Sequence, residues 1–264
     1  MISLTLISTL AALGILGGFF AGLLGFGGGV MMFPLLYYIP PLLGLSRLEA
    51  NTVAAVVISQ VFFSTIIGGM AHLRHRRVHR RIVLGAGPAS AMGSFVGAVS
   101  SANVSEDLLL VLFGLITVLV LGMMFLPPPD QIHEDLSQEQ VVVALLPLIL
   151  CSVAAGSVIG LLGAGNFFFV PLLIYVLKVP TRIAIGSSLF IAMMNTSSGF
   201  VGKLLTGQIP LLLASGVIIG AAVGAFLGEK LHSKISTRTL RQIYGVMVAL
   251  IAARVWMTLL GLDT

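Results

Sequence analysis

The sequence predicts an all-α integral membrane protein made of two inverted repeats of about five helical segments each, eight to ten in total. Of its 264 residues, 58% are hydrophobic and only 9% are charged, against roughly 25% in an average soluble domain. A glycine-rich motif occurs once in each half, and equivalent loops of the two halves carry opposite charge bias. These observations predict the membrane location, the duplication and the inversion, respectively.

The apolar runs fill the chain as a single transmembrane domain, 1–264, and leave no room for a soluble domain. We expect repeat 1 at about 4–126, a linker at 127–140 and repeat 2 at about 141–262. The linker begins with three prolines and continues with polar residues, which is typical of a loop. The first apolar run lacks a basic leading segment, so we interpret it as a retained helix and not as a signal peptide.

Repeat 1 divides into five segments. The first runs into a glycine cluster in which three consecutive glycines, 27–29, each destabilise a helix by about 1 kcal/mol relative to alanine. The short helix that follows should end at Pro40-Pro41, because proline cannot donate the helical hydrogen bond. The predicted segments are 4–24, 30–39, 50–70, 82–99 and 108–126.

Repeat 2 follows the same plan. Gly22 matches Gly160, Pro34 matches Pro171 and Gln60 matches Asn195, with small differences in spacing that loops absorb. The predicted segments are 141–162, 167–177, 183–205, 210–227 and 240–260. Each short segment would cover about half of a ~30 Å hydrocarbon core, so it either re-enters or spans at an unusually short length.

Charge in the loops predicts the orientation. The loop 72–81 is strongly basic, whereas its counterpart 203–209 has one lysine. Conversely, the loop 100–107 is acidic, whereas its counterpart 230–241 is basic. Because cytoplasmic loops carry an excess of lysine and arginine, we expect 72–81 and 230–241 inside, both termini outside, and the two halves in opposite orientations.

The two glycine clusters predict the functional site. A backbone break at membrane depth must be buried in protein or line a cavity, and paired breaks in two repeats point to a transporter site near the midplane. A half-helix that begins at a break presents unpaired N–H groups and a positive dipole end, which attract a small anion. The predicted substrate-binding residues combine the breaks with polar side chains of the long spans: Gly27, Gly28, Gly29, Asn51, Thr52, Gln60, Gly165, Asn166, Ser187, Ser188 and Asn195.

Other small, polar or aromatic residues have a plainer structural interpretation. Isolated glycines in spans are packing notches, and hydroxyls in spans bond to carbonyls of their own helix. Phenylalanines after the second break belong to the core or face lipid, and histidines among arginines are loop residues and not metal ligands. These groups are, in order, Gly85, Gly93, Gly97, Gly220 and Gly224; Ser59, Ser64 and Thr65; Phe167, Phe168 and Phe169; and His72, His75 and His79.

Several functions are excluded by what the sequence lacks. It has no phosphate-binding Gly-x-x-x-x-Gly-Lys-Ser/Thr motif and no mid-span pair of His, Asp, Glu or Cys, so we expect neither an ATPase nor an enzyme. Cys151 is the only cysteine, which rules out an intramolecular disulfide. We expect no cofactor, no metal and no nucleic acid. The expected partners are lipid and a small anion, and assembly of identical copies is compatible with the sequence.

The paired Gly-Leu-Leu-Gly-x-Gly motifs, the proline in each short helix and the Ile185-Gly186-Ser187-Ser188-Leu189 run resemble the sulfite exporter TauE/SafE family over about residues 10–260. The resemblance implies a permease of the bacterial or archaeal inner membrane that exports sulfite, sulfoacetate or a related organosulfonate. Repeat 1 has Ala50-Asn51-Thr52-Val53 where repeat 2 has Ile185-Gly186-Ser187-Ser188, so the two halves should contact the ligand unequally.

Three alternatives to an exporter that works by alternating access remain open at this point. The same helix ends could form an anion channel, the substrate could be a different small anion, or the chain could be a structural membrane protein. A structural role would leave two buried glycine breaks without a purpose.

Overall fold

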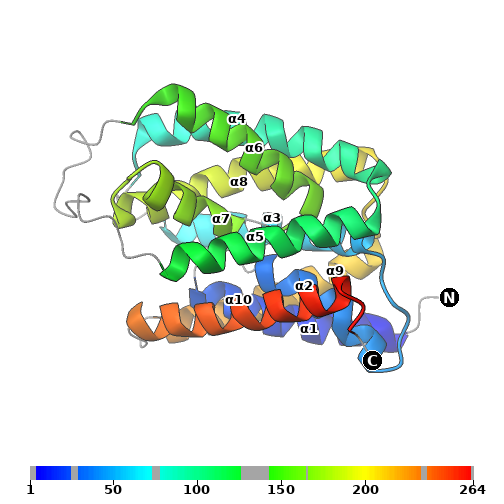
Figure 1. The fold of residues 1–264 in the computed structure, drawn as a ribbon. Helices are drawn as coiled ribbons and strands as arrows, with labels where there is room; N and C mark the ends of the chain where they lie inside the picture. The colour runs from blue at the N-terminus through cyan, green and yellow to red at the C-terminus, as the bar shows by residue number, and fades with distance from the viewer. Residues whose placement is uncertain are drawn as a thin grey trace.

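The computed structural model describes residues 4–24, 29–72, 78–125, 143–164, 166–232 and 237–262, and every regular element among them is a helix (Figure 1). The helices of the first half are α1 (Leu4–Leu24), α2 (Gly29–Leu42), α3 (Ala50–His72), α4 (Arg80–Ser100), the 3₁₀ turn η1 (Ser101–Asn103) and α5 (Glu106–Phe125). Those of the second half are α6 (Leu145–Leu162), α7 (Asn166–Pro171), the π-turn η3 (Leu172–Val176), α8 (Thr181–Leu205), α9 (Leu211–His232) and α10 (Thr237–Leu259).

The all-α membrane class predicted from composition is confirmed. Five helices of the described part are long and apolar enough to cross a membrane, namely Leu4–Leu23, Arg80–Asn103, Glu106–Met123, Leu145–Leu162 and Leu211–Gly228. Large apolar side chains such as Leu84, Leu146 and Ile219 are exposed on their outer faces. Apolar faces of this kind are compatible with the hydrocarbon core of a membrane.

Both short helices differ from the sequence prediction. α2 continues to Leu42, through the prolines that were expected to end it, because the fixed φ of proline suits a helix. The Leu43 N–H closes its last turn on the carbonyls of Ile39 and Pro40 at 3.2 and 3.1 Å. In the second half the expected helix 167–177 is instead α7 followed by η3. Pro171 cannot continue the ladder, and the Leu177 N–H bonds five residues back to the Leu172 carbonyl at 3.1 Å.

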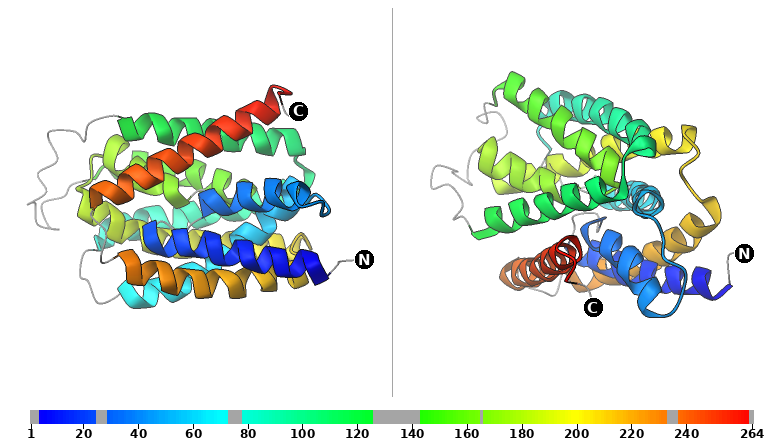
Figure 2. Two further views of the ribbon diagram at one scale, coloured as in Figure 1. Left: turned by 90° about the horizontal axis from the view of Figure 1, so that it is seen from below. Right: turned by 45° about the vertical axis from the view of Figure 1, so that its right-hand side comes forward.

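Each short helix returns the chain to the end of the bundle from which the preceding helix came (Figure 2). α1 leads away from the end that holds both termini, and α2 leads back to it. α6 starts at the opposite end, and α7 with η3 leads back to that end. The two hairpins therefore enter the bundle from opposite ends.

Each half packs its helices against helices of the other half. α1 packs along α9, and α6 packs along α4, so the first helix of each half lies against the fourth helix of the other. The third helices, α3 and α8, contact each other, as do the fifth helices, α5 and α10. The halves are thus interlocked and cannot be separated without exposing both interfaces.

The α1–α9 interface is built on small residues. A Cβ on Gly18 would lie 2.2 Å from the Ala221 carbonyl oxygen, and one on Gly220 would lie 2.1 Å from that of Ala11. Gly224 approaches the Ile15 carbonyl in the same way. Small residues four apart let two helix backbones touch, and this interface is an example.

The α4–α6 interface has the same construction. Added Cβ atoms on Gly93 and Gly97 would lie 2.2 and 2.0 Å from carbonyl oxygens of α6, and one on Gly160 would lie 2.1 Å from the Ser94 carbonyl. Gly85 also meets α6, at the side chain of Leu148. The packing role predicted for the five isolated glycines is therefore confirmed.

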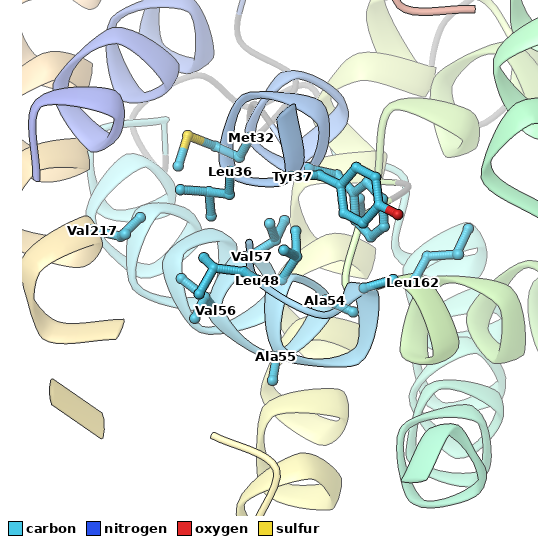
Figure 3. Packing of buried hydrophobic residues seen from close by; sticks show 14 of the residues in the cluster. Met32, Leu36, Tyr37, Leu48, Ala54, Ala55, Val56, Val57, Leu162 and Val217 are labelled. Carbon is cyan, nitrogen blue, oxygen red and sulfur yellow. The ribbon is translucent and has the colours of Figure 1, made fainter. Parts of the chain in front are cut away.

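The largest buried cluster joins the two halves (Figure 3). Leu162, at the end of α6, lies beside Tyr37 of α2 and Ala54 of α3. Val217 of α9 packs on the other side of the same cluster. Phe200 of α8 also packs against this cluster, which thus links α3 to helices of both halves.

Candidate substrate-binding site

The candidate site lies where α3 and α8 meet. Thr65 Oγ1 of α3 is 3.3 Å from Thr196 Oγ1 of α8, and both residues are buried. The ring of Phe62 stacks on that of Phe200 with centroids 4.8 Å apart. Gly199 allows this approach, because a Cβ there would lie 2.4 Å from Ile58. The two helices run in opposite directions, since Phe62 meets Phe200 and Thr65 meets Thr196.

Gln60 contributes the most informative polar group of α3, on a different face of the helix from Ile58, Phe62 and Thr65, which contact α8. Its side chain is fully buried, and its Nε2 donates to Ser64 Oγ at 3.0 Å. Its Oε1 is buried with no hydrogen-bond partner. A buried amide oxygen without a partner costs about 1–3 kcal/mol, and the amide can rotate to present N–H₂ instead. Gln60 therefore has hydrogen-bonding capacity that the protein itself does not use.

Asn195, the counterpart of Gln60 in repeat 2, is also fully buried, next to Thr196. Thr196 Oγ1 donates to the Ala192 carbonyl at 2.7 Å while it contacts Thr65. The two counterpart amides thus lie on the two helices that the Thr65–Thr196 contact joins.

The hydroxyls that were predicted to be structural behave mostly as expected. Ser59 Oγ donates to the Ala55 carbonyl at 2.7 Å, and Thr65 Oγ1 donates to the Phe62 carbonyl at 2.9 Å, both within α3. Ser64 differs, since it accepts the hydrogen bond from Gln60. Thr65 therefore belongs to the contact with α8 as well as to its own helix, whereas the bond of Ser64 stays within α3.

The two glycine breaks adjoin this crossing. A Cβ on Gly29, the first residue of α2, would lie 3.1 Å from Val61 Cγ2 of α3 and 3.4 Å from Ala164 Cα. Ala164 follows Gly163, which has φ +67° and so close an approach to the Ala54 carbonyl that a side chain cannot fit. The start of α2 thus lies against a residue of the second break, Ala164, and against the residue after Gln60.

Part of the predicted set lies outside this description. Gly27, Gly28 and Gly165 are not among the described residues. Asn166 is the first residue of α7, and only its backbone is described.

Asn51 and Ser187 bond at the two ends of the molecule, away from the crossing. Asn51 Nδ2 donates to the Val104 carbonyl at 3.2 Å, beside η1. Ser187 Oγ accepts from the His79 N–H at 3.1 Å, at the start of α4. Thr52 is half-buried and Ser188 is buried, each next to one of these residues. The structure therefore does not bring the predicted set together as one constellation.

Two groups escaped the sequence analysis. Ser94 of α4 is buried with no partner for its Oγ, and it faces Gly199 of α8. Lys203 lies in the last turn of α8, where its ammonium is buried, although the sequence analysis counted it as a loop charge. Its position seven residues after Thr196, which repeats a helical face, was the signal that could have found it.

No group of three His, Cys, Asp or Glu residues that could hold a metal ion occurs in the described part. His79 instead caps α4, with its Nδ1 accepting from the Ile82 N–H at 3.3 Å. Phe169 is fully buried in a core cluster, in agreement with the structural interpretation of that aromatic run. The region thus offers neutral hydrogen-bond donors and acceptors, and the first residue of α2 lies beside it.

Known proteins support a transport role. The profile of the sulfite exporter TauE/SafE family matches residues 10–255. A probable membrane transporter protein of Bacillus subtilis is 24% identical over 93% of this chain and 95% of its own length. Another from Xylella fastidiosa is 28% identical over 94% of each chain, and one from Methanocaldococcus jannaschii is 24% identical over 92% and 94%.

No solved structure matches the chain significantly. The family match, however, covers nearly the whole chain, and the relatives align from end to end. With its helical membrane architecture and its doubled glycine motif, the chain belongs to the sulfite exporter TauE/SafE family.

Proposed function

We propose that the protein exports a small sulfur-containing oxyanion, such as sulfite, sulfoacetate or a related organosulfonate, across the cytoplasmic membrane by alternating access. The observation that carries this proposal is the set of polar side chains buried along α3, in which Thr65 contacts Thr196 of α8 and the Gln60 side-chain oxygen has no hydrogen-bond partner. The family supplies the substrate class, because its name refers to sulfite export.

The chemistry of the crossing favours an anion over a cation. No aspartate or glutamate is among the buried residues of the described part. The available groups are amides and hydroxyls, which donate hydrogen bonds to oxyanion oxygens. The start of α2 beside Val61 adds unpaired backbone N–H groups and the positive end of a helix dipole.

The exchanged packing supports the inverted-repeat part of the proposal. An inverted repeat requires that contacts occur in pairs, so that the contact of α1 with α9 implies an equivalent contact of α6 with α4. Both occur, and α3 and α8, like α5 and α10, contact their own counterparts. The two hairpins that enter from opposite ends fit the same symmetry.

Burial of the crossing supports a carrier over a channel. Gln60, Val61, Thr65, Asn195 and Thr196 are at most 2% exposed. A substrate can therefore reach them only after a rearrangement of the surrounding helices, as alternating access requires. A channel would need a continuous path lined by such groups.

Outward movement of an anion needs no additional energy source. A negative interior expels each unit of negative charge with about 2.3 kcal/mol per 100 mV of membrane potential. Under the proposed topology, the basic loops 72–81 and 230–241 are cytoplasmic and both termini are outside.

The topology can be tested with single cysteines in a Cys151→Ser background. Leu43 is exposed in the loop between α2 and α3, at the end that holds the termini, and Lys178 is exposed in the connection between η3 and α8, at the opposite end. An impermeant thiol reagent added to intact cells should label Leu43→Cys but label Lys178→Cys only after permeabilisation. The reverse pattern would overturn the orientation.

The function itself is tested with purified protein in liposomes under an imposed potential. Sulfite, sulfoacetate, thiosulfate, sulfate and chloride would each be measured for saturable flux. Saturable flux of a sulfur oxyanion that exceeds chloride flux supports the proposal. Single-channel conductance would replace the carrier with a channel, and the absence of flux for every anion would remove the proposed function.

A further inference from the structure

The buried lysine of α8 has a chemistry that the central crossing does not explain. Lys203 is fully buried, and its Nζ donates to Ser101 Oγ at 2.6 Å and to Gln208 Oε1 at 3.2 Å. Both partners are neutral. Among the described residues no carboxylate pairs with Lys203, and the ion pair that is described joins Arg47 to Glu106.

The two partners are themselves held firmly. Gln208 Nε2 donates to the Ala98 carbonyl at 2.9 Å and to Thr206 Oγ1 at 2.6 Å. Ser101 is fully buried, with its Oγ 2.7 Å from the same Ala98 carbonyl. The Gln208 N–H also bonds to the Lys203 carbonyl at 3.0 Å. The turn after α8 thus fixes the ammonium between α4 and α8.

An ammonium in this position is costly. Burial of a charge without a counter-charge costs several kcal/mol. A lysine has three N–H donors, and two of them account for the described contacts. A transient anionic partner would supply both the missing negative charge and an acceptor for the third donor.

The place of Lys203 connects it to the central crossing. It lies seven residues, or two helical turns, after Thr196, on the same face of α8 and about 10 Å further along the helix. This direction leads to the end of the bundle that holds both termini (Figure 1). Its counterpart position in repeat 1 is Gly68, so this cation occurs in one half only.

From these observations we propose that Lys203, with Ser101 and Gln208, forms a second anion-binding position between the central crossing and the end that holds the termini. The ligand class is the transported oxyanion, so this inference rests on the proposed function. An anion that leaves the crossing would exchange neutral hydrogen bonds for a charge-assisted bond to the ammonium before release.

The test compares Lys203→Met with the parent and with Lys178→Met, a matched control in an exposed loop at the opposite end. The apparent affinity for sulfite would be measured by flux in liposomes and by binding to the detergent-purified protein. We expect Lys203→Met to weaken both by about ten-fold or more and Lys178→Met to leave both unchanged. Ser101→Ala, a smaller change, should weaken binding in the same direction by a few-fold.

A charge-rescue experiment separates binding from packing. Lys203→Cys in a Cys151→Ser background can be modified with an aminoethyl thiosulfonate, which restores an ammonium, or with a neutral methyl thiosulfonate of similar reactivity. Recovery of sulfite affinity with the aminoethyl reagent alone supports the proposal. Equal recovery with both reagents would reduce Lys203 to a packing role.

Failure of this inference can be distinguished from failure of the proposed function. If the parent moves sulfite saturably and folded Lys203→Met has the same affinity, the second position is overturned and the exporter stands. If Lys203→Met only loses stability, while the folded fraction transports like the parent, Lys203 merely attaches the turn after α8. If the parent itself neither binds nor moves sulfite, both proposals are overturned.

Discussion

The α1–α9 interface and the α3–α8 crossing are both contacts between the halves, but the first is formed by backbone atoms at glycines and the second by side chains. Along α1 and α9, glycines place each backbone against the other, with added Cβ atoms at 2.0–2.5 Å from carbonyl oxygens. At the crossing, side chains make the contact, and several are polar. The first arrangement has no space for a ligand or for sliding. Elsewhere on α3, Gln60 has hydrogen-bonding capacity that the protein does not use, which suits a site that must exchange partners.

The largest effect should come from disturbing the small-residue interface. Gly18→Leu would drive a side chain into the backbone of α9 and should lower the free energy of unfolding by about 3 kcal/mol or more. Gly122→Leu on α5 is the matched control, since nothing lies within 4 Å of a Cβ there. Thermal unfolding and the yield of monodisperse protein would measure both. Equal stability of the two variants would contradict the packing role.

Loss of the buried Gln60 amide should change transport and leave stability nearly unchanged. Gln60→Met keeps the volume but removes the amide, so we expect sulfite transport to fall by about ten-fold or more. Stability should change by less than about 1 kcal/mol, because a buried oxygen without a partner is removed together with one hydrogen bond. Ser59→Ala, which affects a bond within α3, should leave transport unchanged. Full transport by Gln60→Met would remove Gln60 from the site.

A smaller effect is expected from the direct contact between the two helices. Thr65→Val and Thr196→Val, alone and together, form a double-mutant cycle whose coupling in unfolding free energy should be about 0.5–1 kcal/mol. Ser59→Ala with Ser197→Ala is the control cycle, because these hydroxyls also bond to their own helices, at 2.7 and 2.6 Å, but no described hydrogen bond joins them to each other. Additive behaviour of the threonine pair would show that its contact contributes no coupling.

The smallest effect should occur at the end that holds the termini. Arg47 pairs with Glu106 at 2.7 Å, and both bond to the hydroxyl of Tyr37. Because the Arg47 side chain is 59% exposed, Glu106→Gln should cost at most about 1 kcal/mol, and less in high salt. Unfolding at two ionic strengths would measure this. A loss as large as that of Gly18→Leu would mean that this ion pair within the first half stabilises the fold as much as the small-residue interface between the halves does.

Local chemistry explains what the sequence could predict. Long apolar runs have one stable solution in lipid, the helix, so α1 and α8 end where the sequence analysis expected, at Leu24 and Leu205. Consecutive glycines predicted the interruptions, and glycines spaced for packing identified interfaces such as that of Gly93 and Gly97. The prolines of α2 were misleading, because a proline near the end of a helix removes few bonds.

Which residues share a site was decided only by tertiary packing. The sequence analysis treated Asn51, Gln60 and Ser187 as equivalent candidates, but the structure bonds Asn51 and Ser187 near opposite ends of the molecule, whereas Gln60 is fully buried within α3. Lys203 looked like a loop charge until the turn at Gln208 placed it between α4 and α8. The sequence by itself determined that the chain is helical and membrane-embedded, because lipid forces each segment to satisfy its own backbone. The partners of each polar side chain depend on contacts between distant segments, which no local pattern contains.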